Sequence, residues 1–294
     1  MKKAFFLFAW MACTLSYSGS LGAEELMQSL TIVGESHQVP ARHLQKSYPE
    51  IRSDIETALG WKLLSQPKVV LIADREVFEK MTGNPAISAF AVPSQHLIVI
   101  LLSSETSQPY ILNATFKHEL CHLLLHDHIQ EVLLPRWLDE GICQWVSGSL
   151  GEILMGRGVA ARGMDIARHF IPLKQLTERF PQDKGSLLLA YEESRRFVEY
   201  LTAHYGKQSL LGILQHLKQG DDIDRAVFAT ISKSFENLQQ EWLEDIQKGN
   251  AWLIWTTQHL YEILFFIGAL LTVLAFVRLT IRKRDYFAEH EDEE

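Results

Sequence analysis

Residues 113–146 read NATFKHELCHLLLHDHIQEVLLPRWLDEGICQWV, and this stretch indicates the fold more than any other part of the chain. Its first segment is typical of a helix that runs through His128, with Asn113 or Thr115 as the N-terminal cap. Pro135 fits the start of a second helix, which extends to the end of this stretch. Because the connection is short, we expect the two helices to pack antiparallel.

The first of these helices carries the pentapeptide His-Glu-Leu-Cys-His at residues 118–122. His118 and His122 are four residues apart, so they share one helix face and can both reach one metal ion. Neutral imidazole is a good ligand for Zn²⁺. Glu119 lies beside that metal rather than on it, where its carboxylate can take a proton from bound water.

A catalytic zinc needs a third protein ligand and an open coordination position. Seventeen residues separate His122 from Glu140, which is enough chain to bring the Glu140 carboxylate, on the second helix, back to face the histidines. His126 and His128 are alternatives on the first helix. Since no glycine breaks that helix, His128 points away from the ligand face and His126 lies two turns from the metal. We expect both to be surface histidines or supports of a ligand.

The pentapeptide followed by Trp-Leu-Asp-Glu-Gly at residues 137–141 resembles the gluzincin metallopeptidases. Their pattern is H-E-x-x-H and, further along the chain, W-L-x-E-G. The resemblance implies that three residues hold one zinc ion per chain: His118, His122 and Glu140. It also implies that Glu119 is the general base.

The resemblance covers roughly residues 28–247. It implies an α+β, zincin-like metallopeptidase domain with a small mixed sheet, active-site helices and a helical C-terminal part like that of bacterial peptidase-MA-like domains. Gluzincins use a Tyr or His to stabilise the oxyanion, and Tyr191 matches best, with Tyr200 and Tyr205 as alternatives. Cys143 departs from the small residue often found there, and no Gly-x-Met-Glu-Asn motif supports an aminopeptidase.

These features predict a membrane-anchored zinc endopeptidase whose peptide or protein substrate lies extended along a strand at 97–102. Asp139 either orients a metal ligand or is an acid on the helix surface. One alternative function is a catalytically inactive zincin-like module that binds a peptide or protein at the membrane. Another interpretation is a metzincin-like site in which His128 takes the place of Glu140.

The two ends of the chain carry membrane-targeting signals. Residues 1–23 combine a basic start, a short apolar run and small residues before acidic ones, which describes a signal peptide or, alternatively, an uncleaved N-terminal anchor. Residues 260–277 are apolar and nearly long enough to span a bilayer. The basic residues after them indicate that the tail at 278–294 is cytoplasmic. We therefore expect residues 24–250 to form one exported domain on the periplasmic side of a bacterial inner membrane.

The composition is that of a folded protein with a sizeable core, because 47% of its 294 residues are apolar and 22% are charged. A net charge of -8 gives no basic surface for nucleic acid, so a nucleic-acid partner is not expected. Beyond the signal peptide only Cys121 and Cys143 remain. They are either a disulfide pair or two small buried apolar residues.

The rest of the chain shows strands first and helices afterwards, the order of an α+β fold. A helix is expected within 41–59, starting near Tyr48 because Pro49 disfavours the helical conformation before it. The glycine-rich segment at 147–163 is expected to be a loop or flap. The other expected elements are strands at 30–33, 68–73 and 96–102 and helices near 173–180, 187–204, 208–218 and 235–247.

Overall fold

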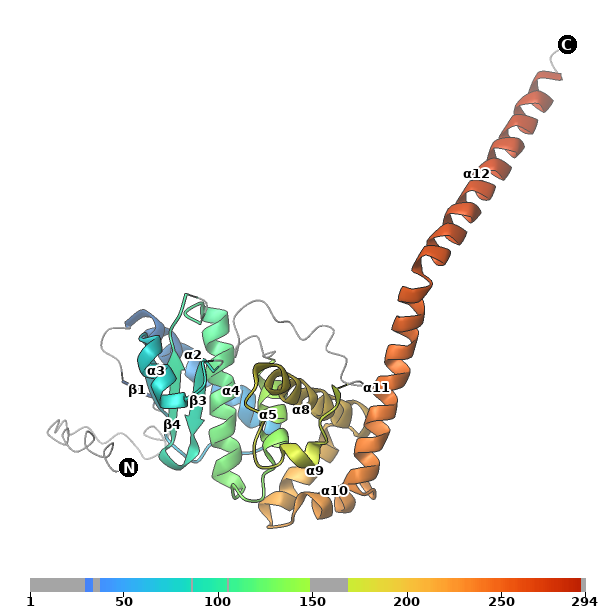
Figure 1. Cartoon of the computed structure of the whole chain (residues 1–294). Coiled ribbons are helices and arrows are strands. Elements are labelled where there is room, and N and C mark those ends of the chain that lie inside the picture. The colour runs from blue at the N-terminus through green and yellow to red at the C-terminus, as the bar shows by residue number, and fades with distance from the viewer. Residues whose placement is uncertain (1–29, 34–37, 86, 105, 149–168, 292–294) are drawn as a thin grey trace, which may run out of the picture.

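The computed structural model describes residues 30–33, 38–85, 87–104, 106–148 and 169–291 (Figure 1). The signal peptide expected at 1–23 and nearly all of the glycine-rich segment at 147–163 lie outside the described residues. The described part is a mixed α and β structure that is mostly helical and contains a small mixed sheet.

The sheet has four strands in the spatial order β1-β2-β4-β3. They are β1 (Thr31–Val33), β2 (Lys68–Ile72), β3 (Ala89–Val92) and β4 (Leu97–Leu101). β1, β2 and β4 are parallel to one another, and β3 is antiparallel to β4. A 3-10 turn, η1 (Pro93–Gln95), connects β3 to β4. The three parallel strands confirm those predicted from β-branched runs. β3 is not evident from the sequence, because its four residues show no alternation of apolar and polar side chains.

The position of β4 corrects one expectation about the substrate. Ile98 of β4 is aligned with Val69 of β2 on one side and with Ala91 of β3 on the other. The strand at 97–102 therefore lies inside the sheet, and its backbone groups are already used. Among the described strands, β3 ends the sheet on that side.

α2 (Gln38–Leu59) starts ten residues before Tyr48, so the start expected from Pro49 is wrong. A proline inside a helix costs about 3 kcal/mol, because it removes one hydrogen bond and crowds the preceding turn. Packing offsets that cost here. Leu44 and Ile55, which lie on opposite sides of the proline, are both completely buried.

α3 (Arg75–Thr82) is a short helix that the sequence analysis does not predict. The side chain of Asp74 caps it by accepting hydrogen bonds from the backbone N–H groups of Glu76 and Val77. Gly83 ends it with a φ of +66°, a conformation that favours glycine. The cap and the glycine were the available sequence signals.

α4 (Pro109–His128) is the helix of the pentapeptide, and it begins before both residues expected to cap it. Pro109 suits the first turn, because the N–H it lacks needs no partner there. The side chain of Asn113 serves a tertiary contact instead, since its Oδ1 lies 2.9 Å from Nε2 of His43 on α2. Thr115 is completely buried.

α5 (Arg136–Ser147) confirms the second predicted helix, with Pro135 immediately before it. Figure 1 shows α4 between the sheet on one side and α5 on the other. α2 also packs against α4. This surrounds α4 with protein, and nearly every residue from Leu112 to Leu125 is at least partly buried. A helix covered on all sides carries no clear polar face.

The C-terminal part is helical, as predicted. Its elements are η2 (Leu173–Leu176), α8 (Lys184–Tyr205), α9 (Lys207–Lys218), α10 (Ile223–Ile231), α11 (Phe235–Gln258) and α12 (Leu260–Glu291). α8 and α9 match two expected helices closely, and α11 extends beyond the expected end at 247. The helix expected at 173–180 is only one 3-10 turn, because Pro172 and Pro181 leave little room for a helix. α10 was not predicted.

One described helix is long and apolar enough to cross a membrane. The window Leu260–Thr280 has a mean hydropathy of 2.4, and none of it is buried against the rest of the protein. It contains the span expected at 260–277. Figure 1 shows α12 projecting away from the other elements, as a single-pass anchor would.

Candidate metal centre

Close packing of α5 against α8 sets the position of the site. A Cβ atom added to Gly141 would lie 2.4 Å from the backbone oxygen of Ser194 and 2.8 Å from Cγ2 of Val198, so only glycine fits. One turn earlier, the buried ring of Trp137 contacts Phe197 of α8, with 5.3 Å between the ring centroids. The Trp and Gly of the Trp-Leu-Asp-Glu-Gly motif thus fix α5 on α8 and leave its other face toward α4.

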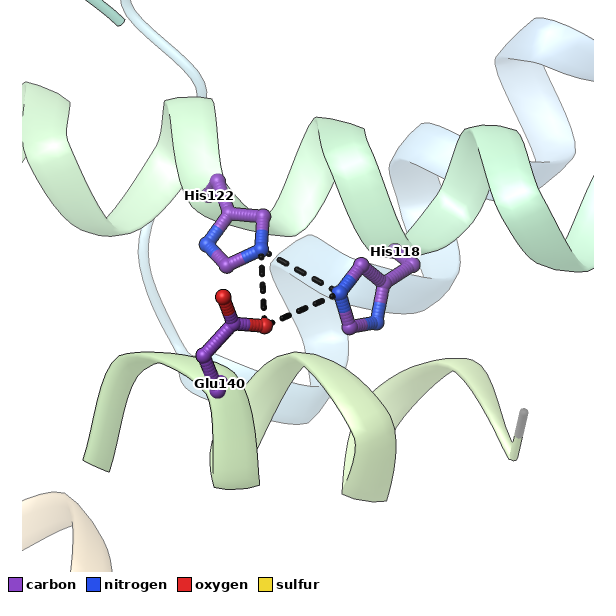
Figure 2. Close-up of side chains that lie close together, drawn as sticks. All are labelled: His118, His122 and Glu140. Atoms are coloured by element: carbon purple, nitrogen blue, oxygen red, sulfur yellow. Dashed lines mark hydrogen bonds and ion pairs between the residues drawn. The ribbon is translucent and has the colours of Figure 1, made fainter. Parts of the chain in front are cut away.

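Three potential ligand atoms converge between α4 and α5 (Figure 2). Nε2 of His118 and Nε2 of His122 are 3.2 Å apart. Oε2 of Glu140 lies 3.4 Å from the former and 3.6 Å from the latter, and all three residues are buried. Two nitrogen or oxygen ligands on a tetrahedral zinc, at about 2.0–2.1 Å from it, are about 3.3 Å apart. The three residues therefore fit a zinc ion.

Glu119 lies on α4 beside the two histidines and is only 5% exposed. Burial raises the pKa of Glu119, and the nearby histidines His118 and His122 offset part of that rise. Its carboxylate is not one of the three converging ligand groups. A buried carboxyl next to a metal set has the surroundings of a proton acceptor.

Asp139 connects two histidines of α4. Its Oδ1 lies 2.8 Å from Nδ1 of His122, and its Oδ2 lies 3.1 Å from Nε2 of His126. Burial alone would raise the pKa of Asp139, but the charges and hydrogen bonds of both histidines lower it to about 2. A carboxylate that accepts from Nδ1 leaves Nε2 of the same ring for a metal. The structure thus places Asp139 and His126 beside a ligand.

The outer oxygen of Glu140 is held by two further residues. The hydroxyl of Tyr191 donates to Oε1 of Glu140 at 3.4 Å, and Nη2 of Arg136 lies 3.6 Å from the same oxygen. Burial and the Glu140 charge both raise the pKa of Tyr191. Burial would raise the pKa of Glu140 as well, but the two histidines lower it well below its ordinary value.

Tyr191 is predicted from its sequence context, whereas Arg136 and Phe180 are not. The guanidinium carbon of Arg136 lies 5.2 Å from the centroid of the Phe180 ring. The signal for Arg136 was its position, because residues four apart on a helix are neighbours and Glu140 follows it by four. No sequence signal pointed to Phe180.

Other residues considered for the site lie elsewhere. Nε2 of His128 is 2.8 Å from the backbone oxygen of Lys62, which removes the geometric basis of a metzincin-like site. The hydroxyl of Tyr205 donates to Glu241 at 2.8 Å. Tyr200 contacts the rings of Tyr205 and His204.

Cys121 and Cys143 are both free and completely buried. They lie on α4 and α5, which pack against each other, and burial together with the neighbouring Cys121 raises the pKa of the Cys143 thiol. Sγ of Cys143 also lies 3.4 Å from Nδ1 of His122. The structure therefore has two small buried thiols behind the ligands and no disulfide between them.

The fold and the ligand set define a zincin-like class of protein, in which two packed helices bring two histidines and a later glutamate together. The sequence model of the Peptidase MA superfamily matches residues 83–248, more than half of the chain, and the chain therefore belongs to that superfamily. The match runs from before β3 into α11, so it includes both helices of the site. No curated protein shows a significant match to the chain. Membership in the superfamily indicates a peptidase-related function of zincin type.

Proposed function

We propose that this protein is a zinc endopeptidase that hydrolyses a peptide or protein at a membrane. The observation that carries the proposal is the spacing of the three ligand atoms of His118, His122 and Glu140, in a chain of the Peptidase MA superfamily. These three residues would hold one zinc ion. Zinc held in this way would lower the pKa of a bound water toward ~7 and would polarise a carbonyl group.

Glu119 is the general base in this proposal. It follows His118 directly on α4 and is buried next to the ligand set. It takes a proton as water attacks the scissile carbonyl carbon, and it then gives that proton to the leaving amine. This transfer turns the amine into a good leaving group.

Tyr191 is proposed to stabilise the oxyanion by donating a hydrogen bond to it. Of the three tyrosine candidates in the described part of the chain, Tyr191 is the one whose hydroxyl contacts a ligand residue. It is 5% exposed, so water competes little for its hydroxyl. Asp139 holds the ring of His122 in place during the reaction.

The substrate is proposed to pair with the outer edge of β3 (Ala89–Val92). This replaces the pairing with the strand at 97–102, which β2 and β3 already occupy. α4 packs against β3 as well as against α5. β3 therefore contacts the helix that carries His118 and His122. An extended peptide that adds to a sheet edge gains backbone hydrogen bonds in any sequence.

The chain is proposed to be a single-pass protein of a bacterial inner membrane, with residues 24–250 in the periplasm. Support comes from α12 and from the basic residues that follow its apolar part. These are Arg278, Arg282, Lys283 and Arg284. Positive charge next to a span is retained in the cytoplasm. The segment 1–23 would provide export.

Metal content tests the ligand set. We expect the purified full chain to contain one zinc ion, measured by plasma mass spectrometry, and the Glu140→Ala variant to lose it. Zinc retained by Glu140→Ala would contradict the three-residue set. The Glu131→Ala variant is the matched control, because that exposed acid has no described contact with the site.

Activity tests the reaction. Zinc-loaded wild type should hydrolyse members of a peptide library, and Glu119→Gln should keep zinc while losing about 10²-fold or more in rate. If Glu119→Gln hydrolyses peptides at the wild-type rate, Glu119 is not the base. If the zinc-loaded wild type binds peptides but hydrolyses none, the protein is the inactive binding module instead.

A further inference from the structure

We propose that Arg136 recognises a carboxylate of the substrate close to the scissile bond. This inference rests on the proposed function, and it adds a substrate class: peptides that place an acidic group next to the bond that is cut.

Contacts of both its backbone and its side chain hold Arg136 beside the three candidate metal ligands. It is the first residue of α5, and its backbone N–H donates to the carbonyl oxygen of Thr177 at 2.8 Å. Its guanidinium lies against the ring face of Phe180 on one side and faces Oε1 of the buried Glu140 on another. Buried partners on two sides therefore fix the orientation of the group.

The side chain of Arg136 also reaches solvent. The side chain of Arg136 is 44% exposed, whereas that of Glu140 beside it is 10% exposed. The contact with Oε1 of Glu140, at 3.6 Å, is longer than a hydrogen bond. A planar guanidinium carries five N–H donors, and a carboxylate can accept two of them side by side.

Charge favours an anion at this position. A divalent cation held by His118, His122 and Glu140 draws on the charge of the Glu140 carboxylate. The Glu140 carboxylate then pairs less strongly with Arg136. Asp139, the next acid on α5, already pairs with two histidines of α4. The exposed side of the Arg136 guanidinium is therefore the positive group that a substrate carboxylate can reach.

The carboxylate has two sources: a Glu or Asp side chain, or the C-terminal carboxylate of the peptide itself. The test uses the zinc-loaded full chain with Glu119→Gln, so that peptides bind without being cut. A random peptide library is synthesised twice, once with free C-terminal carboxylates and once with C-terminal amides. Peptides retained by the protein are identified by mass spectrometry, and affinities of selected peptides are measured by fluorescence anisotropy.

Retained peptides should be rich in carboxylates. Loss of retention in the amide library assigns the C-terminal carboxylate, and retention of amides that contain Glu or Asp assigns the side chain. Adding Arg136→Gln should weaken binding of these peptides by about tenfold to a hundredfold. The Arg136→Glu variant should instead retain peptides that are rich in Lys or Arg. Arg179→Gln removes a charge from the exposed residue that directly precedes Phe180, and it should leave the selection unchanged.

Three results would overturn the inference: no carboxylate enrichment, the same enrichment in Arg136→Gln, or loss of zinc in Arg136→Lys and Arg136→Gln alike. The last result would mean that Arg136 only supports Glu140. Hydrolysis is followed separately with Glu119 intact. Hydrolysis without carboxylate preference contradicts this inference alone, whereas Arg136-dependent binding without any hydrolysis contradicts the proposed function alone.

Discussion

The two carboxylate oxygens of Glu140 face different groups. Its Oε2 faces Nε2 of His118 and of His122, and its Oε1 faces Tyr191 and Arg136. The Tyr191 hydrogen bond and the nearby Arg136 charge hold the outer oxygen, so the inner oxygen points at the histidines. The carboxylate therefore offers a single oxygen to a metal, which suits a site with an open position.

Tyr191 contacts that outer oxygen, so replacing it tests whether its hydroxyl only holds Glu140 in place or also acts in catalysis. Tyr191→Phe should lower the rate constant kcat by about 10²-fold while zinc content and KM change little, because the hydroxyl acts on the transition state. Steady-state kinetics and metal analysis measure both. A Tyr191→Phe protein that loses zinc but regains full activity at high zinc would show that the hydroxyl only holds Glu140. Tyr205→Phe is the matched control.

Glu193 is a buried acid that the proposed mechanism does not use. It is completely buried on α8, and its Oε1 accepts the backbone N–H of Ile171 at 3.0 Å. Burial raises the pKa of Glu193 to about 8. The unfolded chain has the ordinary, lower pKa, so the folded state binds this proton more tightly. Its contribution to stability is full below about pH 4 and is lost as the pH rises to 8.

Glu193→Gln should therefore gain stability relative to wild type as the pH rises. We expect the difference in melting temperature, variant minus wild type, to increase between pH 5 and pH 8. Thermal unfolding at a series of pH values measures it. A difference that stays constant with pH would mean that Glu193 does not titrate in this range. The exposed Glu178→Gln variant is the control.

At the scale of elements, the site is a consequence of where α5 lies. α8 packs behind α5 through Gly141 and Trp137, and α4 lies in front of it with the histidines. A shift of α5 away from α8 would move the Glu140 carboxylate relative to His118 and His122. We therefore expect stability and metal binding to be coupled through this contact.

Gly141→Ala tests that coupling. Its Cβ would meet backbone atoms of Ser194, which cannot move as a flexible side chain can. We expect a loss of about 1–3 kcal/mol or more in the free energy of unfolding, and weaker zinc binding. Denaturant unfolding and metal titration measure these. Gly185→Ala, near the start of α8 where a Cβ has room, should be nearly neutral, and an equal loss there would contradict the packing explanation.

At the scale of the whole molecule, one helix joins the globular part to the apolar span. α11 begins inside the core, where Phe235, Leu238 and Trp242 are buried, and continues to Gln258. α12 starts two residues later, and none of its apolar part is buried against the rest of the protein. So much exposed apolar surface indicates a partner such as a lipid bilayer.

The full chain should therefore remain with membranes during carbonate extraction, and a chain that ends at Gln258 should be released. Fractionation followed by immunodetection measures both. Extraction of the full chain by carbonate would contradict a spanning α12. Retention of the shortened chain would show that the N-terminal segment is an uncleaved anchor.

Local patterns predicted much of this structure. The strand positions from β-branched runs, the helix of the pentapeptide and the second helix after Pro135 all follow from periodicity and proline position. They hold because the apolar runs and the proline positions differ clearly from the sequence around them. β3 and α3 were not predicted, because β3 shows no alternation and α3 is a short helix, and the predicted start of α2 was wrong, because packing around Leu44 overrides Pro49.

The sequence by itself determined the ligand types, their spacing on α4 and the apolar span, because these depend only on neighbours along one chain segment. Tertiary structure alone decided three other features. It placed β3 rather than β4 at the sheet edge, it brought Arg136 and Phe180 to Glu140, and it put His128 against Lys62. These depend on which elements pack together, and packing energies are summed over residues far apart in the chain.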